Sequence, residues 1–106
     1  MEKILELIDD IKKDIASNKI ILYMKGTKEM PMCGFSSTAV NILNYYNLDY
    51  KAVNVLEDPS IRQELSKFSN WPTIPQLFHQ GELIGGSDIM VELHNNGELS
   101  KILELK

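Results

Sequence analysis

The first half of this chain alternates between helix-like and strand-like stretches, and their order limits the folds that are open to it. Four isoleucines at spacings of four, three and four predict an amphipathic helix that packs on a sheet; they are Ile4, Ile8, Ile11 and Ile15. The β-rich run Lys19–Met24 predicts a strand, and apolar residues from Ala39 to Tyr46 predict a helix after a polar loop. Since residues 49–55 predict a second strand, this half is typical of a β-α-β unit.

The second half begins with a well-marked helix start. Asp58 suits the N-cap of a helix and Pro59 suits its first position. The apolar face of this helix is expected to carry Ile61, Leu65 and Phe68.

A hairpin and a closing helix are predicted after it. Residues 75–80 and 82–85 flank the turn residues Gln80–Gly81, which predicts a β-hairpin. Gly85-Gly86-Ser87-Asp88 then leads into a final helix from Ile89. The chain therefore predicts an α/β protein in one domain, residues 1–106, in which a β-α-β unit is joined to a β-β-α unit.

Charge and hydropathy exclude two classes of partner. The net charge of −4 lacks the basic excess with which nucleic-acid-binding domains neutralise phosphates, so we expect no nucleic-acid partner. The longest apolar run, Ile20–Met24, is far shorter than the roughly 20 residues that span a bilayer, and Met1-Glu2-Lys3 begins an acidic helix rather than a signal peptide. We therefore expect a cytoplasmic protein with no membrane segment.

Cys33 is the only cysteine, and it lies where the first predicted strand is followed by its helix. Its spacing to Ser36 matches a Cys-x-x-Cys pair whose second member is replaced, and serine can neither form a disulfide nor match a thiolate as a metal ligand. Any thiol chemistry is therefore monothiol, and a second sulfur must come from outside. A helix N-terminus and a nearby Lys25 would favour the thiolate. The alternative is a buried cysteine that behaves as a small hydrophobe.

Four motifs occur in register along the chain. They are Met24-Lys25-Gly26-Thr27, Cys33-Gly34-Phe35-Ser36, Trp71-Pro72-Thr73-Ile74-Pro75-Gln76-Leu77 and Gly85-Gly86-Ser87-Asp88. Together they resemble a monothiol glutaredoxin of the Cys-Gly-Phe-Ser class over nearly the whole chain. The resemblance implies the thioredoxin/glutaredoxin fold, with a four-stranded mixed sheet flanked by helices and an extra N-terminal helix.

The resemblance also implies a glutathione site. Its residues would be Lys25, Cys33, Phe35, Arg62, Ile74, Pro75, Gly86, Ser87 and Asp88. Lys25 and Arg62, assisted by Gln63, would hold the glycine carboxylate. Main-chain groups of Ile74, followed by a cis Pro75, would bind the cysteinyl part of glutathione.

The γ-glutamyl end of glutathione would lie at the start of the last helix. Gly85-Gly86 would let the N–H groups of Ser87 and Asp88 approach its carboxylate, and the Asp88 side chain would meet its ammonium group. Structural interpretations stay open beside these roles: Lys25 and Arg62 as solvated surface charges, and Asp88 as an N-cap.

Four positions need a separate interpretation. Phe35 could shield the sulfur or be a core residue. Ser87 stands where many relatives of the class carry a second cysteine, so an intramolecular disulfide with Cys33 is impossible here. His79 and His94 match no metal or catalytic-triad spacing and are expected to be structural or surface residues.

The function implied by the resemblance is that of an iron–sulfur cluster carrier or sensor in cluster assembly and iron homeostasis. A [2Fe–2S] cluster takes four thiolate-type ligands. Cys33 from each of two chains and the sulfurs of two glutathiones would complete the set in a homodimer; a BolA-like protein and cluster acceptors are the other implied partners. The alternatives are a glutathione-dependent thiol–disulfide oxidoreductase acting through Cys33, with at most weak activity, and a thiol-independent interaction module.

Overall fold

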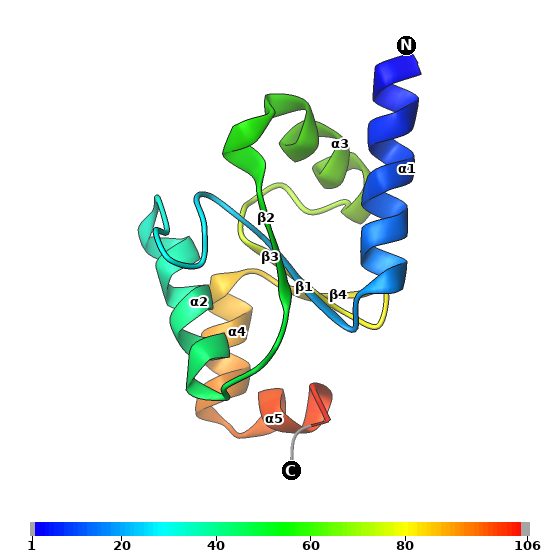
Figure 1. Cartoon of the computed structure of the whole chain (residues 1–106). Helices are drawn as coiled ribbons and strands as arrows, with labels where there is room; N and C mark the ends of the chain where they lie inside the picture. The colour runs from blue at the N-terminus through cyan, green and yellow to red at the C-terminus, as the bar shows by residue number, and fades with distance from the viewer. Residues whose placement is uncertain (1, 105–106) are drawn as a thin grey trace.

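The computed structural model describes residues 2–104 and has a four-stranded sheet between two layers of helices (Figure 1). The strands are β1 (Ile20–Met24), β2 (Lys51–Asn54), β3 (Gln76–His79) and β4 (Glu82–Gly85). They lie in the order β2-β1-β3-β4; β2 is parallel to β1, whereas β3 is antiparallel to both β1 and β4. The predicted four-stranded mixed sheet is therefore confirmed.

Helices cover both faces of the sheet. They are α1 (Glu2–Ser17), α2 (Gly34–Tyr45), α3 (Pro59–Ser69), α4 (Ser87–Asn95) and α5 (Glu98–Ile102), with a short 3₁₀ turn, η1, at Val55–Glu57. The central strand β1 explains the two layers, because its side chains alternate between the two faces. Leu22 and Met24 pack with residues of α2, α4 and α5, while Ile21 and Tyr23 pack with residues of α1 and α3.

The predicted start of the helix at Asp58 and the predicted turn at Gln80–Gly81 are confirmed. Asp58 is the N-cap of α3, and its side chain accepts a hydrogen bond from Ser60 N at 2.9 Å. Pro59 is the first residue of that helix. In the hairpin, Gln80 and Gly81 have φ angles of 48° and 86°, as a two-residue turn between twisted strands requires.

Several predicted boundaries are wrong by one or two residues, and for two of them the structure shows the cause. The second strand ends at Asn54 rather than at residue 55, because the Asn54 side chain accepts from Leu56 N and starts η1. The closing helix begins at Ser87 rather than Ile89, since Gly86 is its N-cap and the Gly86 carbonyl accepts from Met90 N. The helix α5 that follows was not predicted.

Two apolar residues that the periodicity placed on buried faces are exposed. On α1, Ile11 and Ile15 are buried, but Ile4 is 46% exposed, because the N-terminal end of this helix extends past the sheet (Figure 1). On α3, Leu65 is fully buried while Phe68 is 43% exposed.

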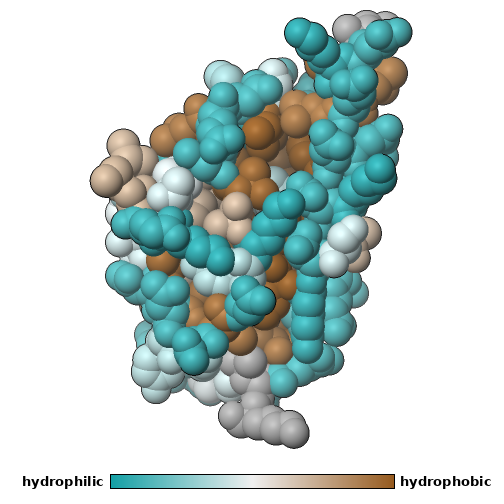
Figure 2. Space-filling model, in the orientation of Figure 1, coloured by the Kyte–Doolittle hydropathy of each residue, from teal (hydrophilic) through white to brown (hydrophobic). Residues whose placement is uncertain are grey.

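The visible surface of α1 is mainly hydrophilic (Figure 2). None of the helices in residues 2–104 is both long enough and apolar enough to span a membrane.

Candidate functional site

Cys33 is the N-cap of α2, so its thiol lies at the positive end of that helix. The residue is extended and partly exposed, and its Sγ accepts a hydrogen bond from Ser36 N at 3.3 Å. The buried Ser36 hydroxyl lies 3.5 Å from the same sulfur and accepts from Lys25 N at 3.0 Å. Ser36 therefore connects the thiol to the end of β1, a role that the sequence analysis did not assign to it.

These contacts favour the thiolate. Partial burial on its own would raise the pKa of Cys33, but the Ser36 hydroxyl, the N–H groups of Ser36 and Phe35 and the charge of Lys25 outweigh it. The pKa of Cys33 is therefore below its ordinary value, and more of the thiol is ionised at neutral pH than in a free cysteine.

We expect Ser36→Ala to raise the pKa of Cys33, because it removes a hydroxyl that stabilises the thiolate more than the neutral thiol. The measurement is the rate of alkylation by iodoacetamide across pH, whose midpoint should move to higher pH. Ser37→Ala is the matched control: Ser37 donates its backbone N–H to the Cys33 carbonyl, and its side chain is not among the groups that shift this pKa. An unchanged midpoint in Ser36→Ala would contradict this account.

A cavity of about 290 Å³ lies next to α2. Its walls include every residue of the predicted glutathione site except Cys33 and the assisting Gln63, which lines a neighbouring cavity together with Lys25 and Arg62. The lining of the first cavity consists of Lys25, Phe35, Arg62, Trp71, Thr73, Ile74, Pro75, Gly86, Ser87, Asp88 and Ile89. Of these, Trp71 and Thr73 belong to one of the four motifs and Ile89 directly follows another, but none of the three was named as a glutathione-binding residue.

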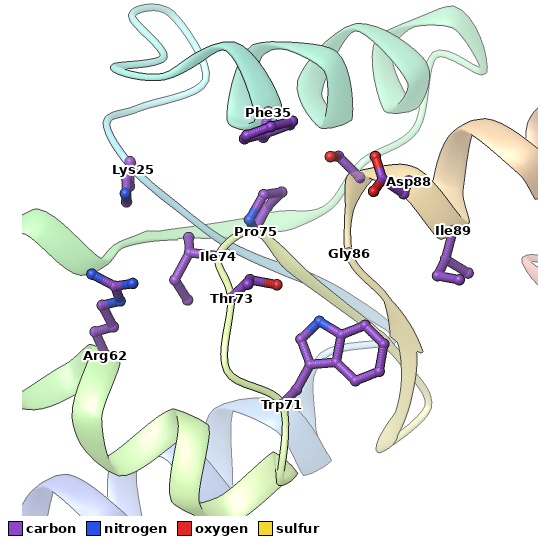
Figure 3. Close-up of a pocket in the computed structure, with 11 residues that line it drawn as sticks. Lys25, Phe35, Arg62, Trp71, Thr73, Ile74, Pro75, Gly86, Asp88 and Ile89 are labelled. Carbon is purple, nitrogen blue, oxygen red and sulfur yellow. The ribbon is translucent and has the colours of Figure 1, made fainter.

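The charged side chains lie at opposite ends of this cavity (Figure 3). Lys25, after β1, and Arg62, on α3, lie on one side, and Asp88, on α4, lies on the other. Ile74 and Pro75 lie between them, joined by the cis peptide bond that the resemblance implies. Phe35 is 63% exposed, so its interpretation as a core residue is wrong.

The glycine pair before α4 brings two stretches of backbone together. Gly85 has φ +148°, and a Cβ there would lie 2.7 Å from Ile89 Cβ. A Cβ on Gly86 would lie 3.3 Å from the Pro75 carbonyl oxygen. Gly86, not Asp88, is the N-cap of α4, and it has no side-chain cap, so the start of this helix faces the cavity without a capping side chain. The N-cap alternative for Asp88 is therefore wrong.

The loop that forms the cavity wall is held by Gln76. Its Nε2 donates to the carbonyl oxygens of Trp71 at 3.0 Å and Thr73 at 3.1 Å, and the residue is fully buried. Gln76 had no predicted role, although a polar residue next to the apolar Leu77 and Phe78 is a signal of buried hydrogen-bond partners.

Residues 20–84 match the family model for glutaredoxins. The chain belongs to the glutaredoxin family. It is 56% identical over 94 residues to the probable monothiol glutaredoxin 2 of Rickettsia typhi, a match that covers 89% of this chain and 85% of the relative. With one cysteine in Cys33-Gly34-Phe35-Ser36, this glutaredoxin is of the monothiol kind.

Solved structures confirm the predicted fold of this glutaredoxin. It is similar to the solution structure of reduced poplar apo GrxS14, with 47% identity, a TM-score of 0.81 and coverage of 92% of this chain and 90% of that one. A buckwheat glutaredoxin–glutathione complex has a TM-score of 0.84, covering 97% and 92% of the two chains. At 22% identity, that likeness concerns the fold alone.

The two histidines lie outside the cavity of this glutaredoxin. His94 Nδ1 lies 2.5 Å from the Tyr46 hydroxyl, in a cluster with Tyr45, and His79 is buried in β3. Across the part of the chain that the structure describes, no group of three or more His, Cys, Asp or Glu side chains could hold a metal ion. Cys33 is the one cysteine of the sequence, so a single chain can supply one thiolate ligand to a metal.

Proposed function

We propose that this monothiol glutaredoxin, acting as one domain over residues 1–106, binds glutathione beside Cys33 and carries a [2Fe–2S] cluster as cargo. Its partners would be a second copy of the chain or a BolA-like protein, and then the acceptors of the cluster. In this role it would act as a carrier or sensor in cluster assembly and iron homeostasis.

The distribution of charge in the cavity carries the proposal. Glutathione has a carboxylate at its glycine end and a carboxylate with an ammonium group at its γ-glutamyl end. Lys25 and Arg62 match the glycine end, while the start of α4 and the Asp88 carboxylate match the other. Ile74 and Pro75 lie between the two charged ends, where main-chain groups can hydrogen-bond to the peptide-like middle of the ligand.

The cluster proposal follows from the number of sulfur ligands. A [2Fe–2S] cluster needs four thiolate-type ligands, and one chain supplies Cys33 alone. Because Cys33 is partly exposed at the end of a helix, it can be shared with ligands from outside the chain. A bound glutathione would bring a second thiol, and two such pairs would give four. Because half of these ligands exchange freely, the arrangement suits delivery better than storage.

Thiol–disulfide exchange is the second candidate, and the lowered pKa of Cys33 favours it. The Cys33 thiolate would attack the glutathione sulfur of a protein–glutathione mixed disulfide, and the protein would leave as a thiolate. A second glutathione thiolate would attack the glutathione sulfur on Cys33. This step gives oxidised glutathione and regenerates the Cys33 thiolate.

We expect Arg62→Gln to weaken glutathione binding by at least about tenfold, because a charge-assisted hydrogen bond to a carboxylate contributes roughly 1.5–3 kcal/mol. The measurement is an NMR titration of the reduced protein with glutathione. Lys67→Gln is the matched control, since Lys67 is a cation of the same helix that lies outside the cavity and pairs with Glu64. Equal affinities for wild type and Arg62→Gln would contradict the proposed site.

A further inference from the structure

The side chain of Asn54 connects the two segments that carry the cations of the cavity. Its Oδ1 accepts hydrogen bonds from Gly26 N and from Leu56 N, both at 2.9 Å. Gly26 directly follows Lys25, and Leu56 belongs to η1, after which α3 carries Arg62. We call this arrangement of Gly26 N–H, Asn54 Oδ1 and Leu56 N–H the Asn54 bridge.

On the Lys25 side, the bridge completes a set of backbone contacts. Lys25 N donates to Ser36 Oγ at 3.0 Å, and the Lys25 carbonyl accepts from Met32 N at 2.9 Å. Gly26 is buried, so without the Asn54 oxygen its N–H would be unpaired inside the protein. A buried N–H group without an acceptor raises the free energy of the folded state. We therefore expect the backbone at Lys25 to move if the Asn54 oxygen is removed.

On the Arg62 side, the bridge fixes the turn that precedes α3. Asn54 is the N-cap of η1. A second cavity, lined in part by Leu56 and Pro59, shares both Lys25 and Arg62 with the first. Because open space lies on two sides of these cationic side chains, their spacing depends mainly on the backbone segments from which they extend.

We infer that Asn54 is a positioning residue that sets the spacing of Lys25 and Arg62, and through it the affinity for a terminal carboxylate of the ligand. This inference rests on the proposed function and assigns the residue to the glycine end of glutathione. Two donors from separate segments must converge on one carboxylate, and a charge-assisted hydrogen bond that is lengthened by about 1 Å is largely lost.

The test compares two ligands that differ only at this carboxylate: glutathione and glutathione amide, whose glycine end is a neutral carboxamide. Asn54→Ala should weaken binding of glutathione about tenfold and binding of the amide by less than about twofold. Asn54→Asp keeps an oxygen acceptor for both N–H groups, so it should restore most of the preference for glutathione. Both affinities are measured by NMR titration of the full chain.

Amide hydrogen exchange tests the bridge without any ligand. In Asn54→Ala, the amides of Gly26 and Leu56 should lose protection together, and in Asn54→Asp they should keep it. Asn96→Ala is the matched control: Asn96 Oδ1 accepts from Glu98 N at 2.9 Å, the same local side-chain contact, between α4 and α5 and outside the cavity. This variant should leave both the affinities and the two amides unchanged.

Each other outcome has a definite meaning. If Asn54→Ala weakens binding of both ligands equally, Asn54 acts on the whole fold and the inference is wrong. Unchanged protection of the Gly26 and Leu56 amides would also overturn it. If wild type binds neither ligand, the proposed function fails and the role in ligand affinity fails with it, whereas the exchange data still decide whether the bridge exists.

Discussion

Cys33→Ser is expected to lose thiol exchange and cluster binding completely while it keeps the fold. Cys33 is the only thiol in the chain, and a serine hydroxyl is neither ionised near neutral pH nor a comparable ligand for iron. Its position as the N-cap of α2 is one that serine fills well, so the helix should be retained. The measurements are turnover of a glutathionylated peptide and the visible spectrum after anaerobic reconstitution with iron, sulfide and glutathione.

Met32→Leu is the control for Cys33→Ser, because Met32 is the adjacent sulfur-containing residue and is 60% exposed. Met32→Leu should change neither the turnover nor the visible spectrum. Thermal unfolding should show that wild type, Cys33→Ser and Met32→Leu are all folded. If Cys33→Ser supported full function in cells, the thiol chemistry proposed here would be irrelevant there. The chain would then act as a thiol-independent interaction module.

The second large effect is expected from Gly26→Ala, which should lower the free energy of unfolding by roughly 3 kcal/mol. Gly26 has φ +92°, and a Cβ there would lie 2.4 Å from the Met30 carbonyl oxygen and 2.7 Å from Met32 N. Both neighbours are backbone atoms of the loop that leads to Cys33, so neither can turn aside as a flexible side chain would. The measurement is equilibrium unfolding in urea.

Gly97→Ala separates the two causes of this loss. Gly97 has φ +81°, but a Cβ there would have no atom within 4 Å. This variant should lose only about 1 kcal/mol, the cost of a left-handed conformation for alanine. Equal losses in the two variants would mean that the close packing around Gly26 does not contribute, and that the loop before Cys33 is less tightly held than its hydrogen bonds indicate.

Local signals predicted most of the fold, and the family resemblance named most of the residues that line the cavity. The N-cap Asp58 and the turn Gln80–Gly81 work through neighbours a few residues away, so the sequence around them contains the whole cause. The four motifs contain most of the residues that line the cavity, since each motif is a short loop or helix start, whereas Arg62 lies outside them and was named only through the resemblance. Their convergence on one cavity was implied by the resemblance rather than by any single motif.

Roles that depend on distant partners could not be predicted. The Asn54 side chain accepts a hydrogen bond from Gly26 N, 28 residues away, and the Ser36 hydroxyl accepts one from Lys25 N, 11 residues away. Neither contact can be inferred from neighbouring residues in the sequence. Periodicity fails for a related reason. It reports which side chains share a face of a helix, as Ile4 and Ile11 do, but not whether another element covers the whole length of that face.

The central claim is that glutathione and Cys33 together form a site that neither completes alone. Its most direct test is anaerobic reconstitution of the wild-type protein with iron and sulfide, with and without glutathione, followed by the visible spectrum and the mass in solution. The account predicts a coloured dimer only when glutathione is present, and a colourless monomer without it. A cluster that forms and persists in the absence of glutathione would contradict the account.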